Sequence, residues 1–395
     1  MVWNEEIEVF VKTHIREDVR QLALRKHHIQ GEELRTALMQ IELRQRIMEK
    51  LPHFSSVEGV RFPSKLSTEQ CSSERCATFK CEIVGGFYEK GVDLTGGLGI
   101  DTLSLAQLCE QMTYIEQDAD ICQAARNNIP LMADNVEIRQ MTAEEWLMSS
   151  DERIGLAFID PARRDETGEK VFKTEDCIPN IKMLLPRLKA RAEKVVIKLS
   201  PMLDLKECIE TLKPEKLWII SVNNECKELV AVVGKDTDET DIEAIELRKN
   251  GNARTSFKLS EEKNANGRYA RKVEVGQVIA EPYAAQMKSG AWKTLCQRYN
   301  AEMIAPSSHL YVTEGDFPGR QFTVTKICIF NKRNAAKILK GKANIAVRNF
   351  PMTVAQIRKR FGTAEGGERY IFLTTDTNNN RIIIECKKLP LKNSQ

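Results

Sequence analysis

The chain has 395 residues, of which 42% are hydrophobic and 29% charged, a composition ordinary for a soluble globular protein and a length that suits two or three domains. No apolar run reaches the roughly 18 residues that a membrane helix needs, and the first residues are acidic where a signal peptide would be basic and then apolar. Eleven irregularly spaced cysteines, with no C-x-x-C pair, indicate free thiols and no metal site. We therefore expect a cytoplasmic protein without a membrane segment.

Helices are predicted first along the chain. Residues 5–50 place apolar side chains such as Ile7, Val11 and Ile15 at helical spacing among charged ones. Pro52 and the polar residues after it mark the end of this pattern. Residues 1–60 are therefore predicted to form an N-terminal helical region.

Short apolar strands alternate with helices between residues 91 and 233, which predicts a parallel sheet covered on both faces. The strands are expected at residues 91–94, 112–115, 136–139, 156–159, 195–199, 217–221 and 229–233. The helices are expected at residues 102–111, 119–128, 143–147, 177–188 and 204–211. Because only residues 222–228 join the last two strands, we expect these to pair antiparallel as a hairpin.

The rest of the chain divides into two stretches of different character. Residues 235–268 are rich in charged and polar side chains, and we interpret them as a weakly ordered connection or a small polar excursion from the sheet. Strand, helix, strand, helix, strand and strand are then expected at residues 322–330, 334–339, 343–348, 354–361, 370–374 and 381–386. This order predicts a compact α+β module that ends in a hairpin with an Asn-rich turn.

Charge is distributed unevenly along the chain. Residues 321–395 carry 15 Lys and Arg against 4 Asp and Glu, a net charge of +11, so the first 320 residues carry −8 of the total of +3. A basic module of this kind is expected to bind a polyanion, such as the phosphates of a nucleic acid, although a basic surface can also serve solubility alone. The candidate contacts include Lys332, Arg333, Lys337, Arg348, Arg358 and Arg360.

Residues 92–101 read as a strand that ends in a glycine turn and leads into a helix, where α/β proteins hold a nucleoside. Thr102 stands where a dinucleotide fold would have its third glycine. The pattern D-x-x-x-G-x-G resembles motif I of the class I methyltransferases, which bind S-adenosylmethionine. Thr95 stands where many such turns have another glycine. The cofactor contacts expected here are Asp93, Thr95, Gly96, Gly97, Gly99 and Asp101.

Acidic residues follow the next two strands at positions that suit an adenosine. Glu116 comes about 20 residues after the glycine turn, where a carboxylate can accept both ribose hydroxyls. Ala143 and Glu144 follow the third strand and offer a backbone amide and a carboxylate near the adenine ring. An acid in the first turn of a helix is also common for electrostatic reasons alone, so Glu144 has a second interpretation.

The fourth strand ends in Asp160-Pro161-Ala162-Arg163-Arg164. This resembles motif IV of the methyltransferases that act on nitrogens of nucleic-acid bases, usually Asp-Pro-Pro and an aromatic residue. Asp160 and the carbonyl of Pro161 would accept the hydrogens of the acceptor and aim its lone pair. Ala162 and Arg163 depart from the pattern, and a guanidinium at Arg163 could stack on a base or bind a phosphate.

Two further groups are placed near the site without firm roles. Gln70 and Ser72 precede the glycine turn, where several methyltransferases contact the methionine end of the cofactor. Ser67 followed by Gln70 is also a plain helix capping box, which we favour. Side chains at the end of the fifth strand and in the following hairpin should line the substrate side, namely Lys198, Ser200, Pro201, Asn224 and Glu225.

These motifs together resemble the bacterial class I methyltransferases that carry a THUMP-like C-terminal domain. The resemblance also rests on residues 224–227, Glu281-Pro282 and residues 343–351. It implies a Rossmann-like methyltransferase domain at residues 61–268, a ferredoxin-like segment at 269–323 and a basic THUMP-like domain at 324–395. It also implies S-adenosylmethionine as the cofactor and RNA as the partner, because THUMP domains bind RNA.

The expected function is methylation of a base in tRNA or rRNA by direct displacement, with Asp160, Pro161 and Arg163 at the acceptor. Two alternatives stay open. The first is a methyltransferase with a substrate other than nucleic acid. The second is a non-catalytic RNA-binding protein that keeps the cofactor fold, against which the acids at positions 93, 116 and 160 weigh. The sequence does not indicate an oligomeric state.

Overall fold

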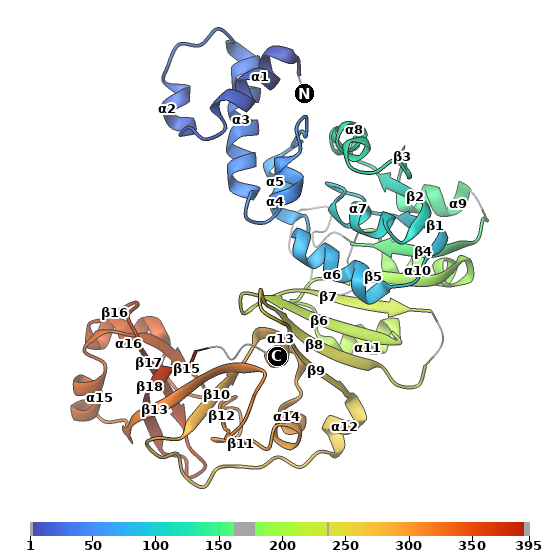
Figure 1. Cartoon of the computed structure of the whole chain (residues 1–395). Helices are drawn as coiled ribbons and strands as arrows, with labels where there is room; N and C mark the ends of the chain where they lie inside the picture. The colour runs from blue at the N-terminus through green and yellow to red at the C-terminus, as the bar shows by residue number, and fades with distance from the viewer. Residues whose placement is uncertain (1–2, 150, 162–177, 235–236, 391–395) are drawn as a thin grey trace. The chain divides into compact units, whose positions relative to one another are not determined.

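The computed structural model describes residues 3–149, 151–161, 178–234 and 237–390, and it divides the chain into two compact units (Figure 1). The first unit holds Met1–Pro214 and Val230–Asp236, and the second holds Glu215–Leu229 and Thr237–Gln395. The ten cysteines within these described ranges form no disulfide bond. No helix in the described part of the chain is long and apolar enough to cross a membrane.

The first unit begins with the predicted helices. The first three pack around a small apolar core that includes Ile7, Phe10 and Leu22. Asn4 and Asp18 cap the first two by accepting hydrogen bonds from backbone amides of the first turn, which fixes where each helix begins. The helices are α1 (Glu5–His14), α2 (Val19–Ala23), α3 (Gly31–Ile47) and α4 (Pro52–Ser56).

A mostly parallel sheet follows, in the order β3-β2-β1-β4-β5-β7. Its strands are β1 (Tyr88–Asp93), β2 (Cys109–Glu116), β3 (Val136–Gln140), β4 (Ile154–Ile159), β5 (Ala192–Leu199) and β7 (Glu225–Val233). The order reverses between β1 and β4, which pair in parallel, and ligands of open α/β sheets bind at such a reversal, beyond the carboxyl ends of the strands.

Helices precede and connect these strands (Figure 1). The predicted alternation of strands and helices is confirmed, although most strands extend a few residues beyond the predicted ranges because polar residues continue the ladder at their ends. The helices are α5 (Lys65–Gln70), α6 (Glu74–Val84), α7 (Ile100–Ala106), α8 (Ala119–Asn128), α9 (Ala143–Ser149), α10 (Ile181–Arg191) and α11 (Leu205–Leu212).

In the second unit the strands follow the order β7-β6-β8-β9, with residues 225–229 of β7 belonging to this unit. The turn between β6 (Lys216–Val222) and β7 is only two residues long. Asn223 and Asn224 both have positive φ, at 54° and 60°, which makes it a type I′ hairpin turn. The hairpin was therefore predicted correctly, but its connection of residues 222–228 was predicted too long.

Of the two interpretations of residues 235–268, the weakly ordered connection is wrong for the described residues from 237 onward. They form β8 (Asp241–Leu247), parallel to β6, then antiparallel β9 (Ala253–Lys258) and α12 (Leu259–Asn264). The sequence did not indicate β8 because its glutamates look like surface residues, although Glu243 and Glu246 are buried and paired with other groups. Glu243 accepts a hydrogen bond from the indole of Trp218 at 3.1 Å, and Glu246 accepts one from the amide of Asn224 at 2.7 Å.

A second sheet of the same unit has the order β11-β12-β10-β13-β18-β17-β15. Its strands are β10 (Val278–Pro282), β11 (Glu302–Met303), β12 (Tyr311–Val312), β13 (Gly319–Ile329), β15 (Asn344–Val347), β17 (Arg369–Thr375) and β18 (Arg381–Lys388). Short helices α13 (Ala284–Ser289) and α14 (Trp292–Arg298) follow β10.

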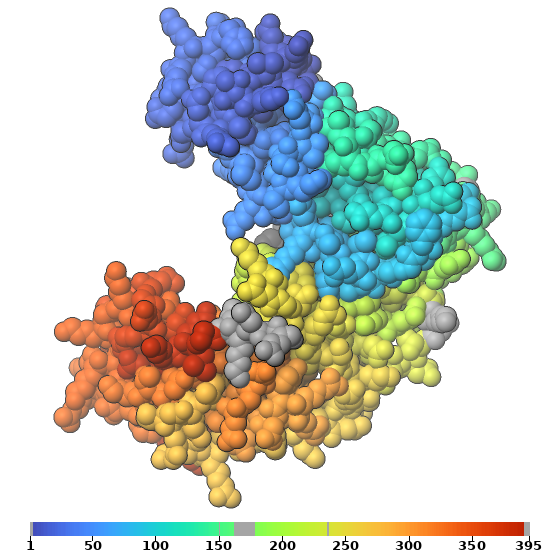
Figure 2. Space-filling model, viewed as in Figure 1, coloured from blue at the N-terminus to red at the C-terminus, as the bar shows by residue number. Residues whose placement is uncertain are grey.

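The C-terminal module has the predicted order of strands and helices. Helices α15 (Lys332–Ile338) and α16 (Val354–Phe361) pack against one face of β17 and β18 through Ile338, Ile357, Ile371 and Ile383. Figure 2 shows the surface of this module in orange and red. A small parallel pair, β14 (Gly341–Lys342) and β16 (Thr363–Ala364), completes it.

Candidate active site

A cavity of about 740 Å³ lies in the first unit, at the carboxyl ends of β1, β2 and β4, where the order of the sheet reverses. Most residues that the sequence singles out line it. These are Gln70, Ser72, Thr95, Gly96, Gly97, Asp101, Glu116, Ala143, Glu144, Asp160 and Pro161. Asp93 and Gly99 lie outside the lining, and Arg163 lies outside the described residues. The size of the cavity is typical of small-molecule and cofactor sites.

The glycine turn passes tightly over the second strand. A Cβ on Gly96 would overlap the ring of Tyr114, which is fully buried, so only glycine fits there. The hydroxyl of Tyr114 donates a hydrogen bond to the carbonyl of Gly97 at 2.6 Å. Gly99 has φ of 84° and serves as the N-cap of α7, a conformation that favours glycine. The turn is thus fixed from below before any ligand binds.

Asp93 supports this turn from behind the cavity wall. Its carboxylate accepts hydrogen bonds from the amide of Thr95 at 3.0 Å and from the hydroxyl of Thr102 at 2.6 Å. Complete burial raises the pKa of Asp93 to about 7, although the two hydrogen bonds act in the opposite direction. Thr102, which replaces the third glycine of a dinucleotide fold, therefore holds Asp93 in place.

Glu116 presents a carboxylate at the end of β2. One oxygen accepts a hydrogen bond from the amide of Gly97 at 3.0 Å, and the other accepts one from the amide of Asp118 at 2.8 Å. These bonds orient the group toward the cavity, which it lines. Ile115, Ile121 and Met141 form an apolar wall beside it.

Glu144 and Glu145, the two acids at the start of α9, have different surroundings. The amide of Thr142 donates to Glu145 at 2.8 Å, and the amide of Glu145 donates to the hydroxyl of Thr142 at 3.1 Å, so Glu145 completes the helix cap. Glu144 lines the cavity instead. The cap of α9 therefore does not need Glu144, whose position in the cavity lining agrees with the expected contact.

The capping box expected at Ser67 is wrong. Helix α5 begins at Lys65, and Ser64 is its N-cap, accepting a hydrogen bond from the amide of Ser67 at 3.1 Å. The helix starts earlier because Ser64 offers the same cap one turn upstream. Gln70 then ends the helix at the cavity wall, and Ser72 follows it there.

A buried ionic cluster lies at one end of the cavity. Ser72 donates a hydrogen bond to Asp101 at 2.7 Å, and the Lys80 ammonium lies 3.1 Å from Asp101. Lys198 Nζ lies 3.9 Å from Asp101 and forms a close ion pair with Asp160. Burial alone would raise the pKa of Asp101, but Lys80, Lys198 and the Ser72 hydroxyl outweigh it and hold this pKa below its usual value.

Lys80 was not identified from the sequence, and Lys198 was placed near the site without a role. The signal for Lys80 was its position in α6, in line with the buried residues Cys76, Ala77 and Val84. A lysine in an apolar helix stripe needs a buried partner, because an unpaired charge is costly there. Its side chain is completely buried.

The glycine turn and the fourth strand are joined by a side chain. The amide of Asp160 donates a hydrogen bond to the hydroxyl of Thr95 at 2.6 Å. Thr95, which departs from the commonest glycine pattern, therefore ties the glycine turn after β1 to the residue that follows β4.

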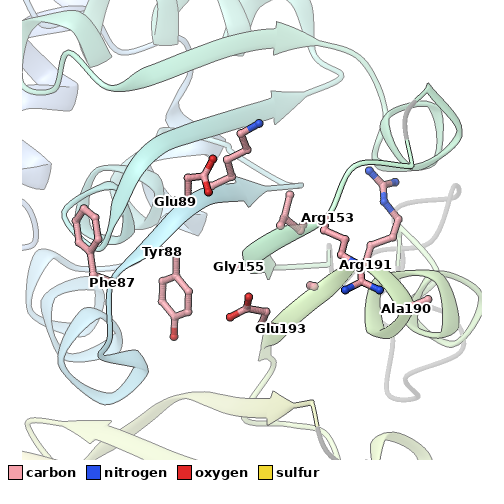
Figure 3. Close-up of a pocket in the computed structure, with 11 residues that line it drawn as sticks. Phe87, Tyr88, Glu89, Arg153, Gly155, Ala190, Arg191 and Glu193 are labelled. Carbon is pink, nitrogen blue, oxygen red and sulfur yellow. The ribbon is translucent and has the colours of Figure 1, made fainter.

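A second cavity, of about 480 Å³, opens at the other edge of the sheet, at the starts of β1, β4 and β5 (Figure 3). One of its charged groups, Arg191, serves the fold. Arg191 donates hydrogen bonds to the carbonyls of Leu147 and Glu152, both at 3.1 Å, and stacks on Trp146. Among the described residues no group of three or more His, Cys, Asp or Glu is placed to hold a metal ion. The cavity at the carboxyl ends is therefore the candidate active site.

Family comparisons match the C-terminal part of the chain. A family described as THUMP domain-like matches residues 319–388, and a ferredoxin-like domain family matches residues 279–318. The comparison with curated proteins found no match.

Solved structures match over more of the chain. The crystal structure of a candidate methyltransferase from Porphyromonas gingivalis W83 is 29% identical, with a TM-score of 0.86 over 99% of this chain and 100% of that one. A candidate methyltransferase from Escherichia coli is 16% identical, with a TM-score of 0.31 over 42% of this chain and 89% of that one. One from Streptococcus mutans, in complex with SAH, is 12% identical, with a TM-score of 0.30 over 40% and 96%.

The two weaker likenesses carry no argument, whereas the first extends over nearly the whole chain. The mixed α/β architecture and the two domain matches agree with it. The chain is therefore similar over its whole length to the Porphyromonas gingivalis structure, and its C-terminal part carries the ferredoxin-like and THUMP-like domains that its motifs indicated.

Proposed function

We propose that the protein is an S-adenosylmethionine-dependent methyltransferase that acts on RNA. The observation that carries the proposal is the convergence of the glycine turn, Glu116, Glu144 and Asp160 on one cavity. The THUMP-like match and the basic C-terminal module support RNA as the substrate.

The lining of the cavity fits the cofactor. The Glu116 carboxylate is held by two backbone amides and faces the cavity, where it can accept the two hydroxyls of a ribose. Ile115, Ile121 and Met141 offer apolar surface for an adenine ring, with Ala143 and Glu144 beside them. When bound, S-adenosylmethionine supplies a methyl group on a positively charged sulfur, which a nucleophile takes by direct displacement.

Asp160 and Pro161 would orient the acceptor. Both line the cavity, and the hydrogen bond from the Asp160 amide to Thr95 fixes the backbone beside the glycine turn. A group held in this way can bring an acceptor into line with the methyl group, which lowers the entropic part of the barrier.

Exposed cations of the C-terminal module would bind the RNA backbone. Lys332, Arg333, Lys337 and Arg360 have exposed side chains on α15 and α16. Arg348 and Arg358 serve the fold instead. Arg348 pairs with buried Glu281 at 2.6 Å, and Arg358 donates to the carbonyls of Thr363 and Ala343 at 3.3 Å each.

Two measurements test the cofactor and the substrate. Calorimetry should show S-adenosylmethionine binding that weakens about tenfold or more in Glu116→Gln, because hydrogen bonds to a charged group are lost. Glu110→Gln is the matched control, since Glu110 is exposed on the same strand. Binding of NADH and not of S-adenosylmethionine would refute the cofactor assignment.

Nucleoside mass spectrometry of RNA from a deletion strain should show one methylated nucleoside missing, and the intact gene should restore it. Changing Lys332, Arg333, Lys337 and Arg360 to Gln should weaken RNA binding and flatten its dependence on salt, because fewer phosphates are neutralised. Gln at Lys249, Lys263 and Arg271, which are also exposed, is the control. An unchanged nucleoside profile would refute RNA as the substrate.

A further inference from the structure

We propose that the methyl acceptor is a hydroxyl oxygen, the 2′-hydroxyl of an RNA ribose, and not a nitrogen of a base. This inference rests on the proposed function and narrows it to one class of acceptor. The feature that carries it is the ion pair between Lys198 and Asp160, the residue placed at the acceptor. The sequence motif alone had indicated a base nitrogen.

The pair is built into the sheet. Ile159 of β4 and Ile197 of β5 are partners in a parallel ladder. Asp160 directly follows Ile159, and Lys198 directly follows Ile197. Their side chains therefore meet at the carboxyl edge. The Lys198 side chain is 9% exposed and that of Asp160 is 32% exposed, so the carboxylate faces the cavity and the ammonium lies behind it.

The ammonium is held from a second side as well. Lys198 Nζ lies 3.9 Å from Asp101, which is itself paired with the fully buried Lys80. Two lysines and two carboxylates thus form one neutral cluster. Because the Lys198 side chain is only 9% exposed, water screens its ammonium weakly, and the ammonium lies directly behind the carboxylate that would bind the acceptor.

Such a pair suits an oxygen acceptor better than a nitrogen acceptor. A base nitrogen gains positive charge as it takes a methyl group, and a fixed ammonium nearby opposes that change. A hydroxyl loses its proton and gains negative charge, which the same ammonium stabilises. One carboxylate oxygen of Asp160 is taken by Lys198, and the other can accept the single hydrogen of a hydroxyl.

The step balances as follows. The O–H bond of the acceptor breaks, and its proton passes to the Asp160 carboxylate. The electron pair left on oxygen forms the new bond to the methyl carbon. The bond between that carbon and sulfur breaks with its electrons returning to sulfur, which becomes a neutral thioether. Asp160 then releases its proton to water, and Lys198 keeps its charge throughout.

The first test is the product of the full-length wild-type protein. RNA from the deletion strain is treated with protein and S-adenosylmethionine, then digested and examined by mass spectrometry. We expect a nucleoside that carries the methyl group on its sugar fragment, and a phosphodiester that resists alkaline cleavage at that nucleotide, because the 2′-hydroxyl is blocked. A methyl group on the base fragment would overturn the inference and leave the proposed function standing. Absence of any methylated nucleoside would overturn both.

The second test concerns Lys198 as a positioning residue that acts through Asp160. Lys198→Met should lower the methylation rate about 100-fold, comparable to the loss of one preorganised electrostatic contact. The remaining rate should rise more steeply with pH, because hydroxide replaces the missing stabilisation. Lys198→Arg should keep most of the rate, and Lys206→Met, which removes an exposed ammonium, should change nothing.

Cofactor binding provides the readout that does not depend on activity. Calorimetry should give the same S-adenosylmethionine affinity for wild type, Lys198→Arg and Lys206→Met. If Lys198→Met does not fold, the methyl position in the product still decides whether the acceptor is an oxygen. The rate and pH profile of Lys198→Arg, compared with wild type, then test the role of Lys198. Equal pH profiles for the Met and wild-type proteins would contradict the role of Lys198.

Discussion

Thr95 accepts a hydrogen bond from the backbone amide of Asp160, with 2.6 Å between the two atoms. Thr95 belongs to the glycine turn after β1, and Asp160 directly follows β4. These strands are neighbours at the point where the order of the sheet reverses. A single hydroxyl thus links the loop proposed to hold the cofactor to the residue proposed to hold the acceptor.

Replacing Thr95 with valine removes this acceptor and keeps the shape of the side chain. We expect the free energy of unfolding to fall by about 1–2 kcal/mol, because the Asp160 amide loses its partner. Methylation should fall further than cofactor affinity, since the acceptor end is displaced. Urea unfolding, calorimetry and the methylation rate measure the three effects. Thr95→Ser keeps the hydroxyl and should restore most of them. Equal losses in both variants would argue against the hydrogen bond.

Gly96→Ala should damage both stability and cofactor binding. The added Cβ would overlap the buried ring of Tyr114, which cannot move without breaking its bond to the Gly97 carbonyl. We expect the free energy of unfolding to fall by about 1–3 kcal/mol, as at other overpacked sites. Gly315→Ala is the matched control, because a Cβ there meets open space. Urea unfolding of both variants checks the difference, and equal stability would contradict the tight turn.

Asp93 should make stability depend on pH between about 4 and 7. In the unfolded chain this carboxyl ionises near its usual value of 3.8, whereas in the folded protein burial raises its pKa to about 7. The folded state therefore binds more protons in this window, and its stability falls as pH rises through it. Asp93→Asn keeps one oxygen to accept from the Thr95 amide, places an NH2 donor beside the Thr102 hydroxyl, which can turn to accept from it, and cannot ionise.

The comparison of wild type with Asp93→Asn isolates this effect. As pH rises from about 4 to about 7, wild type should lose roughly 3–4 kcal/mol relative to the variant, and the difference should then stay constant. Unfolding in urea at a series of pH values measures it. Parallel stability curves for the two proteins would show that Asp93 titrates normally in the folded state.

Much of the candidate site could be predicted because its signals are local in sequence. Thr95, Glu116, Glu144 and Asp160 each follow closely on a predicted strand, and parallel strands bring their carboxyl ends to one edge. The alternation of strands and helices was visible for the same reason. The strand boundaries were predicted less accurately, because polar residues at the strand ends still form backbone pairs with the neighbouring strand.

Features that depend on partners distant in sequence could not be predicted. Glu243 and Glu246 made β8 look polar, since their buried partners lie on other segments. The roles of Lys80 and Lys198 depend on Asp101 and Asp160, which only the folded sheet brings near them. Buried polar groups that satisfy one another across the fold leave no periodic signal.

Lys80 offers the sharpest test of the buried cluster. Lys80→Met removes the ammonium that lies 3.1 Å from Asp101 and leaves that buried carboxylate with Lys198 at 3.9 Å. We expect a loss of about 3–5 kcal/mol in the free energy of unfolding, as for other broken buried pairs. Adding Asp101→Asn should recover part of it, because the unpaired charge disappears.

Lys90→Met breaks the exposed pair with Glu152 and should have little effect. A double-mutant cycle in urea measures the coupling between Lys80 and Asp101. Additive losses would mean that the two side chains do not stabilise each other, and that the acceptor end of the cavity is held in place by packing alone.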